Sequence, residues 1–483
     1  MDRASTLRLD RPAPSQGHVR PASSGRPYRL AVAMALGVAL VLTGGASRYD
    51  ETQQMLARLA AITAIAASLW PLDIAVLRRR WGWLGGAGAI YGLLLAQLCP
   101  LPPALWASLP GHGLYAQVAT QVGAAGWRPL SLTPDLTVNA LFALLPATAM
   151  ALCALHLASR SRLRLAEGVV LAALASGLLG LLQLATGGGL HLFRESSADS
   201  AVGLFANRNH QAVLEACALP LLGAVAGVRV RESHGRIAIP AALIAAAFML
   251  ASILLTGSRM GLLLGAVGLA GAAWSYRASG HRLLPRRWPA RAALAGLTCV
   301  TLAALVLAAA HSGVIQRLQP DGVTGDTRAA MLQPLLSMAR AFMPWGGGFG
   351  AFDAVYRHFE PGALLSTIYM NQAHDEPLQL AIEGGAPALA LQALFGLWWA
   401  VTALRCARGE ASGRRRAMGG AAMVVTVILM LSSLVDYPLR TPLLSALFVL
   451  ACVEMALSAE KAAAPDPWRS KSQDPPVDAE IAA

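Results

Sequence analysis

The sequence predicts an all-α polytopic membrane protein with about twelve transmembrane helices and one large loop on the outer side of the membrane. Three observations support this fold class. The chain of 483 residues is 55% hydrophobic and only 13% charged, which is too apolar for a soluble assembly of domains. Its apolar runs of roughly 17–25 residues are long enough to cross a hydrocarbon layer of ~30 Å as helices. Arginine and lysine crowd every second gap between these runs.

Short polar gaps join most of the apolar runs, which indicates one bundle over residues 30–458 without an independent soluble domain. The first run resembles the apolar part of a signal peptide. The further runs behind it, and the lack of a small-residue cleavage site, predict a retained first helix. The predicted transmembrane ranges are 30–46, 55–77, 81–98, 136–158, 165–186, 209–228, 237–256, 260–276, 291–310, 376–403, 417–434 and 440–458.

The distribution of basic residues predicts the orientation in the membrane. Alternate gaps and both termini together hold 28 of the 39 basic residues, and the other side holds 11. Basic residues beside membrane spans resist translocation, so the rich side and both termini are expected to be cytoplasmic. The basic residues left on the outer side then need another explanation. They are Arg48, Arg58, Arg128, Arg194, Arg208, Arg259, Arg317, Arg328, Arg340, Arg357 and Arg440.

Composition excludes several other classes of protein. A net charge of +13 would suggest nucleic-acid binding in a soluble protein. Here the excess lies in short cytoplasmic loops, where topology and anionic lipids account for it, so we expect membrane lipids and no nucleic acid as partners. The six cysteines form no CxxC pair and no disulfide framework. Polar, proline-containing composition predicts a disordered cytoplasmic tail at 1–29 and a second cytoplasmic tail at 459–483.

Two predicted outer segments are longer than the rest. Residues 99–135 contain a semi-apolar stretch that could lie on the membrane surface, and residues 311–375 form the largest outer loop. Within that loop, Thr327 is predicted to cap a helix from Arg328 to about Phe342, which Pro344 would end. The glycine-rich stretch over residues 346–350 is predicted to be a hinge. It is no nucleotide-binding loop, because it follows no strand and lies outside the cytoplasm.

Polar motifs gather on this outer side at five places. An arginine at the membrane boundary, such as Arg259 between two spans with almost no loop, is costly unless it meets a partner or a water-filled cavity. The same cost applies to Glu215 and Glu383 inside predicted spans, so we expect each to orient an arginine or a histidine. The motifs are GLFANRNH at 203–210, TGSRMG at 256–261, the Arg328 and Leu332 pair, NQAHDEPLQLAIEGG at 371–385 and DYPLRTP at 436–442.

Together these motifs resemble the O-antigen ligase and polymerase superfamily, multi-pass enzymes that transfer glycans from a polyprenyl diphosphate on the periplasmic side of the bacterial inner membrane. The resemblance covers about residues 200–442, which we take as a ligase-like core, and makes residues 311–375 a periplasmic loop. The family pattern has a periplasmic histidine followed by an Asn-like residue and, nine residues later, a glycine pair. His374 and Gly385 keep that spacing, whereas Asp375 replaces the Asn-like residue and Ala388 the second glycine.

The resemblance implies roles for residues at these motifs. His374 matches the family's catalytic histidine, and Arg259 and Arg328 match two arginines that hold the diphosphate. We also predict substrate contacts from polar residues of the first and last motifs, and a supporting role for three acids. The predicted substrate contacts are Asn207, Arg208, Asn209, His210, Asp436 and Arg440, and the predicted supporting acids are Glu215, Asp375 and Glu383.

The implied chemistry needs these residue types. A sugar that leaves a polyprenyl diphosphate builds negative charge on phosphate oxygens, which guanidinium forks match bidentately and stabilise. A neutral histidine can accept the proton of the attacking hydroxyl, which contributes about 10²–10⁴-fold. The resemblance implies inversion at the anomeric carbon without a metal ion or cofactor.

Three glycan transfers remain open because they share the donor site. A ligase would transfer a polymer to the lipid A core, a polymerase would extend an O-antigen or exopolysaccharide on its lipid carrier, and a protein O-oligosaccharyltransferase would use a serine or threonine. A transporter or flippase is the alternative from another class. It should show broken helices or paired halves around a polar midplane site, and the sequence has no such pairing.

Overall fold

A computed structural model of the protein describes residues 27–48, 51–70, 74, 78, 80–187, 189–194, 196, 200–281, 322–362, 365, 370–409 and 413–460. For residues 233–236 and 322–329 it describes the backbone without the side chains. The predicted span at 291–310 and almost all of both predicted tails lie outside these residues.

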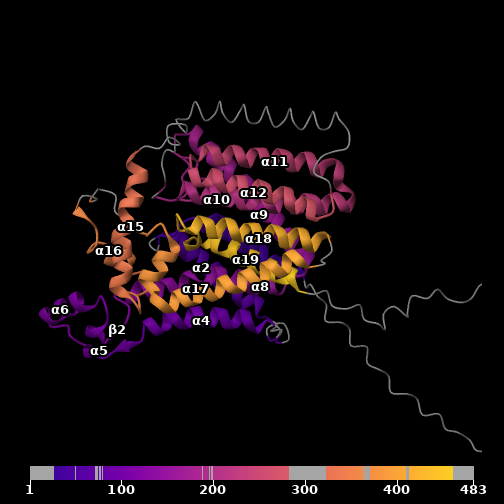
Figure 1. The fold of residues 1–483 in the computed structure, drawn as a ribbon. Coiled ribbons are helices and arrows are strands. Elements are labelled where there is room, and N and C mark those ends of the chain that lie inside the picture. Colours follow the sequence, from indigo (N-terminus) through magenta and orange to yellow (C-terminus); the bar gives the residue numbers. More distant parts are fainter. Residues whose placement is uncertain are drawn as a thin grey trace, which may run out of the picture.

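Most helices run side by side through the molecule, and the remaining elements gather beyond one end of them (Figure 1). The helices of this bundle are α1 (Pro27–Thr43), α2 (Thr52–Ser68), α4 (Trp81–Gln97), α7 (Pro134–Ala143), α8 (Leu145–Leu155), α9 (Ser159–Ala185), α10 (Arg208–Arg229), α11 (Gly235–Leu255), α12 (Arg259–Ala278), α17 (Glu376–Arg408), α18 (Gly413–Ser433) and α19 (Pro442–Ala459). A π turn, η1 (Val230–His234), joins α10 to α11.

The elements beyond the end of the bundle form what we call the cap. They are α5 (Pro103–Ser108), α6 (Gly113–Gln121), α15 (Gly322–Phe342), α16 (Phe352–Tyr356) and the paired strands β1 (Pro100–Leu101) and β2 (Arg128–Pro129). A 3-10 turn, η3 (Pro438–Arg440), connects α18 to α19. We call the end of the bundle beside the cap the cap end and the opposite end the far end.

Most helices lie close to the predicted apolar runs, but α2 ends at Ser68, well before the end of the run predicted at 55–77, because the chain turns at Leu69 ahead of Pro71. In the described part of the chain, seven helical segments are long and apolar enough to cross a membrane by length and composition, which supports an all-α membrane protein. The run predicted at 136–158 is two helices, α7 and α8, which meet at Leu144. Pro146 follows in the first turn of α8, where a missing N–H leaves no helical bond unmade.

Helix α10 lies at the centre of the bundle. Its membrane-spanning window is 83% buried, and it packs against α9, α11, α12 and α18. Glycines let α10 and α12 approach closely: a Cβ atom at Gly223 would lie 2.1 Å from the Ala272 carbonyl oxygen, and one at Gly268 would lie 2.4 Å from that of Ala216. Such contacts between small residues drive the packing of membrane helices. They hold the first turns of α10 and α12 together at the cap end.

The structure corrects one prediction for the outer loop and confirms another. Helix α15 begins at Gly322, so Thr327 lies inside the helix and the predicted capping role is wrong. The capping pattern is a local signal, and the residues before it continue the helix without a proline to stop it. The helix does end at Phe342, shortly before Pro344, as predicted. A second hydrophobic core, around Met338, Phe352 and Ile382, fixes α15 and α16 on the first half of α17.

Candidate active site

Asp436 lies at the centre of a polar cluster at the cap end, in the turn after α18. Its carboxylate is 2% exposed. Asn209 Nδ2 donates a hydrogen bond to Asp436 Oδ2 at 2.8 Å, and the Tyr437 backbone N–H donates to Oδ1 at 3.0 Å. The same Oδ1 lies 3.2 Å from His374 Nδ1 and 3.8 Å from His210 Nε2. One buried carboxylate therefore serves two histidines, one in α10 and one just before α17.

The surroundings of Asp436 determine its charge. Burial raises the pKa of this carboxyl, but the hydrogen bond with His374, the charges of the two histidines and the hydrogen bond from Asn209 together hold the pKa well below its usual range. Burial, and then the neighbouring Asp436 charge, raise the pKa of Tyr437 to about 12. At neutral pH the cluster thus contains a fixed anion beside a neutral phenol.

His374 sits immediately before the start of α17 in an unusual backbone conformation. Its φ of 51° lies in the left-handed region that residues other than glycine rarely adopt. Two contacts hold the segment there: Asp375 caps α17 by accepting from the Leu378 N–H at 2.9 Å, and the Ala373 N–H donates to Gln379 Oε1 at 2.9 Å. The His374 side chain is 29% exposed. With Nδ1 toward Asp436, its Nε2 is the ring nitrogen available to a substrate.

The first turn of α10 supplies the other side of the cluster. Asn207 is the N-cap, and its Oδ1 accepts from the Asn209 N–H at 2.8 Å. The Asn207 side chain also hydrogen-bonds the Tyr437 phenol. His210 is 1% exposed, with the edge of its ring toward Tyr437 at 5.2 Å between centroids. The Tyr437 ring contacts the His374 ring as well, at 4.9 Å, so this tyrosine separates the two histidines.

Two helices of the bundle begin with an arginine at the cap end. Arg259 is the exposed first residue of α12, and Ser258 caps that helix by accepting from the Gly261 N–H at 3.0 Å. Its turn packs against the turn that starts with Arg208, because a Cβ at Gly261 would lie 2.5 Å from Ala212 Cβ. Both helix N-termini present N–H groups, which favour an anionic ligand. The predicted partner Arg328 belongs to α15, in the part whose side chains the structure does not describe.

The turn that holds Asp436 is tied to α17 by two acids. Glu383, 1% exposed inside α17, accepts from Arg440 at 3.0 Å and from Gln379 Nε2 at 3.1 Å. Glu376 Oε1 accepts from the Leu439 N–H at 3.0 Å. Arg440, predicted to contact substrate, thus forms an ion pair with Glu383, and the pair holds the 436–440 turn against the helix that begins after His374.

The glycine-rich stretch at 346–350 is bound to a kink in α17. Gly385 has φ 61° and ψ −154°, and Pro387 has no N–H, so the Ile382 and Glu383 carbonyls lack their helical donors. The Gly347 and Gly348 N–H groups donate to these two carbonyls, each at 2.9 Å. In return the Ala386 N–H donates to the Pro344 carbonyl at 2.8 Å.

These hydrogen bonds fix the glycine-rich stretch to α17, whereas the sequence predicts that the stretch is a hinge. A Cβ at Gly385 would lie 2.2 Å from the Pro344 oxygen, and one at Gly346 would lie 2.4 Å from the Glu383 oxygen. Gln97 of α4 also donates to the Glu383 carbonyl and accepts from the Phe349 N–H, both at 2.9 Å. The glycines therefore permit close docking, which fixes the cap on the helix that presents His374.

Glu215 lies deeper in the bundle. It is buried in α10, and Gln211 Nε2 donates to its Oε1 at 3.0 Å. Gln211 also accepts from Ser176 of α9, which in turn accepts from the Leu204 N–H at 3.0 Å. The network supports the segment just before Asn207 and contains neither His374 nor an arginine.

Sequence reasoning missed four residues at this site. Tyr437, Glu376 and Gln379 lie within the motifs but received no role, and their positions next to Asp436 and His374 were the available signal. Arg48 lies after α1, and its charge lowers the pKa of Tyr437, which places it near the cluster. Its segment is held there because the Ala206 N–H donates to the Gly45 carbonyl at 3.2 Å. The only signal for Arg48 was its place among the few basic residues of the outer side.

The sequence profile of the O-antigen ligase family matches residues 244–393. The match contains Arg259, Arg328 and His374, and it confirms the resemblance to the O-antigen ligase and polymerase superfamily that the motifs indicate. It supports glycosyltransferase activity of the ligase or polymerase type. No curated protein sequence matches the chain. Asn209 and Asp436 lie outside the matched range, yet the fold brings both to the cluster that contains His374.

Proposed function

We propose that this protein transfers a glycan from a polyprenyl diphosphate carrier to an acceptor hydroxyl on the periplasmic side of the bacterial inner membrane, as an O-antigen ligase. The observation that carries the proposal is the approach of His374 Nδ1 to Asp436 Oδ1 at 3.2 Å. A buried anion on one ring nitrogen keeps a proton there and leaves the other nitrogen basic. A partly exposed histidine in that state is suited to accept a proton from a substrate hydroxyl.

The proposed step is an inverting displacement. The acceptor oxygen attacks the anomeric carbon and forms the new glycosidic bond while the bond from that carbon to the phosphate oxygen breaks. The hydroxyl proton passes to His374 Nε2, and the polyprenyl diphosphate leaves with the bonding electrons. Asp436 stabilises the imidazolium that forms, since its carboxylate stays ionised.

Arginines at the cap end would bind the leaving diphosphate. Arg259 at the first turn of α12 and Arg208 at the first turn of α10 combine guanidinium donors with two helix N-termini. Arg328 on α15 would approach from the cap, and Arg48 adds positive charge beside Tyr437. This much fixed positive charge supports leaving-group stabilisation without a divalent cation, which is the metal-independent mechanism we propose.

Other members of the cluster would act through Asp436. His210 is buried behind Tyr437, so we assign it, with Asn209, to positioning the carboxylate and not to direct substrate contact. The Arg440 and Glu383 ion pair would fix the turn from which Asp436 projects. Glu215 would act at a greater distance, by supporting the segment that precedes Asn207.

Cysteine labelling tests the proposed side of the membrane. In a Cys99→Ser background, Ser337→Cys on the exposed face of α15 should react with a membrane-impermeant thiol reagent added outside spheroplasts. Ser412→Cys, in a basic gap outside the described residues, should react only after the membrane is permeabilised. The unsubstituted background serves as the control. The reverse pattern would place the cluster in the cytoplasm and reject the proposal.

Analysis of surface glycans in a deletion strain tests the proposed acceptor. Loss of a ligase leaves uncapped lipid A core and accumulates polymer on the lipid carrier. Single repeat units would identify a polymerase instead, and loss of glycan from proteins would identify a protein O-oligosaccharyltransferase. In a reconstituted reaction with purified lipid-linked donor, a covalent product should form in the presence of EDTA. Movement of the glycan without a covalent product would indicate a transporter, and arrest by EDTA with recovery on Mg²⁺ would reject metal independence.

A further inference from the structure

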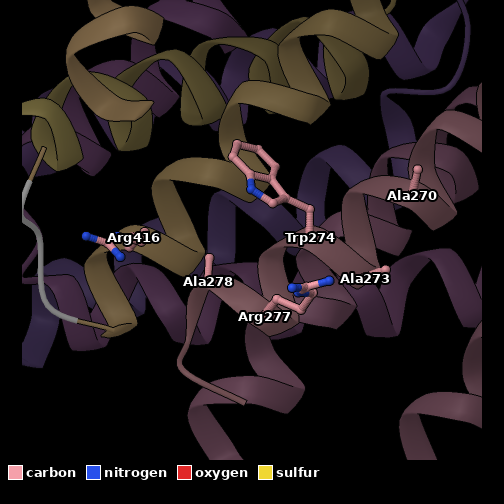
Figure 2. Close-up of a pocket in the computed structure, with 6 residues that line it drawn as sticks. All are labelled: Ala270, Ala273, Trp274, Arg277, Ala278 and Arg416. Carbon is pink, nitrogen blue, oxygen red and sulfur yellow. The ribbon is translucent and has the colours of Figure 1, made fainter. Parts of the chain in front are cut away.

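Two adjoining hollows open at the far end of the bundle, about one helix length from His374. The larger has a volume of about 640 Å³ and is lined by Ala270, Ala273, Trp274, Arg277, Ala278 and Arg416. The smaller, about 240 Å³, shares Trp274 and Arg416 and adds Arg408 at the end of α17. Figure 2 shows Arg277 on α12 and Arg416 on α18, with Ala278 between them and the Trp274 side chain above them in the view. Three helices therefore contribute to one continuous recess.

The lining of this recess is positively charged. Arg277, Arg408 and Arg416 are all exposed, and neither set of lining residues contains an aspartate or glutamate. Other arginines at the same end of the described bundle do have acidic partners, as Arg414 has with Glu232. Arg416 also lies in the first turn of α18, where the helix dipole disfavours a cation. Its guanidinium Nη2 donates to the carbonyl oxygen of Gly409 at the end of α17, at 3.4 Å, and both residues line the smaller hollow.

The rest of the recess is apolar. On α12, Ala273 and Ala270 lie one and two turns further along the helix than Arg277, so a strip of about 10 Å without large side chains runs along the bundle surface from the charged rim. Trp274 stands at the rim with 40% of its surface exposed, in a position typical of tryptophan at a membrane interface. The recess combines a site for an anion at its mouth with a slot for a hydrocarbon chain below it.

We propose that this recess binds an anionic phospholipid of the leaflet opposite the candidate active site. The phosphate lies between Arg277 and Arg416, and an acyl chain lies along Ala273 and Ala270. Charge complementarity selects an anionic headgroup over a zwitterionic one, since guanidinium groups match a phosphate bidentately and no acid among the described lining residues opposes the net charge. Such a lipid would fill the space where α12, α17 and α18 diverge. The inference does not depend on the proposed glycosyltransferase reaction.

Native mass spectrometry of the full-length protein can test this site. Protein released from micelles with equal phosphatidylglycerol and phosphatidylcholine should retain one phosphatidylglycerol. Arg277→Gln/Arg416→Gln should weaken that retention by about tenfold or more, since two charged contacts are lost. Arg160→Gln/Arg405→Gln is the matched control, because it removes the same charge from two exposed arginines at the same end that line neither hollow. The control should retain the lipid within about twofold.

A second variant distinguishes the binding of a lipid in the recess from the binding of a free anion. Ala273→Leu fills the slot but keeps all three arginines, so it should weaken retention of phosphatidylglycerol, and millimolar inorganic phosphate should not displace the lipid. Equal retention of both phospholipids, equal loss in the control, or full displacement by phosphate would overturn the proposal. So would a photoreactive residue at Ala273 that crosslinks to residues 282–321 of the same chain in place of a phospholipid.

Discussion

The two ends of the bundle use charged residues differently. At the far end, arginines are matched with glutamates in ion pairs between helices, as in Arg162 with Glu454 and Arg229 with Glu167. At the cap end, one carboxylate, Asp436, is shared by two histidines and an amide, and Arg259 stands exposed at a helix N-terminus. Paired charges hold helices in place. A shared carboxylate with a partly exposed histidine keeps hydrogen-bonding capacity for another molecule.

The contrast is informative because the sequence distinguishes the two ends by the number of basic residues and by polar motifs, and not by the partners of those residues. Each end has arginines near the ends of apolar helices, and hydropathy treats them equally. The difference comes from the partners. Several far-end arginines pair with glutamates of neighbouring helices, whereas at the cap end two histidines and an amide gather around Asp436. We therefore expect substitutions at the cap end to alter transfer and those at the far end to alter stability.

Asp436→Asn should have the largest effect on transfer among the partners of His374. An amide lacks the charge that stabilises the imidazolium, and its NH₂ group can donate to Nδ1 and leave the proton on the wrong nitrogen. The transfer rate should fall by about 10²–10⁴-fold, the range in which a general base contributes. Asp353→Asn, which removes an acid of the cap that pairs with Arg357, is the control and should retain its rate. Equal transfer rates in both variants would show that Asp436 does not take part in the reaction.

Arg259→Lys should have the second-largest effect on the transfer rate. Lysine keeps the charge but loses the planar fork that binds phosphate through two hydrogen bonds. Transfer should fall by about 10–100-fold, the equivalent of one charged hydrogen bond, with the KM for the lipid-linked donor raised. Arg340→Lys makes the same exchange of a guanidinium for an ammonium group at the exposed end of α15. It is the control and should retain the normal transfer rate. A normal transfer rate in Arg259→Lys would indicate that Arg259 contacts the helix end or lipid headgroups and does not bind the donor diphosphate.

Acid should reduce transfer by a smaller amount. A neutral imidazole must accept the proton, so the transfer rate should be lower at about pH 5.5 than at about pH 7. Asp436 cannot cause this loss. Its pKa lies below the ordinary value of 3.8, so its contribution to stability is present above that value and disappears only as the pH falls through the lower folded-state pKa. Thermal unfolding at both pH values checks that the fold persists, and a flat pH profile would argue against a histidine base.

Glu454→Gln should have the smallest effect on transfer and a clear effect on stability. It removes the partner of Arg162, and both side chains are almost completely buried at the far end. Breaking a buried pair costs about 3–5 kcal/mol because one charge remains uncompensated. The melting temperature should therefore fall, while the transfer rate per folded molecule stays within about twofold. A large loss of rate in the folded fraction would contradict the division of roles between the two ends.

Much of the fold follows from the sequence, because long apolar runs have few ways to satisfy their backbone groups except as helices. The polar cluster was predictable only as a set of positions along the chain. That Asp436 bridges Asn209, His210 and His374 depends on how α10, α17 and α18 converge, and no local pattern encodes this convergence.

The kink of α17 illustrates the same limit. Gly385 and Pro387 mark a break in the helix, but the carbonyls freed there take their donors from a loop almost forty residues earlier in the chain. The glycines at 346–350 therefore suggested a hinge when read alone. Arg48 was missed for a related reason, since it is brought near Tyr437 by the contact between Gly45 and Ala206.

Single-turnover transfer by His374→Asn tests the central claim most directly. Asparagine tolerates the left-handed backbone at this position and can donate to Asp436, but it cannot accept the proton of an attacking hydroxyl. With purified lipid-linked donor and acceptor in liposomes, the account predicts a loss of about 10²–10⁴-fold in the rate, with donor affinity within a few-fold of the unsubstituted protein. His358→Asn, on the exposed surface of the cap, should leave the rate unchanged. A His374→Asn protein that transfers glycan at the normal rate would contradict the account.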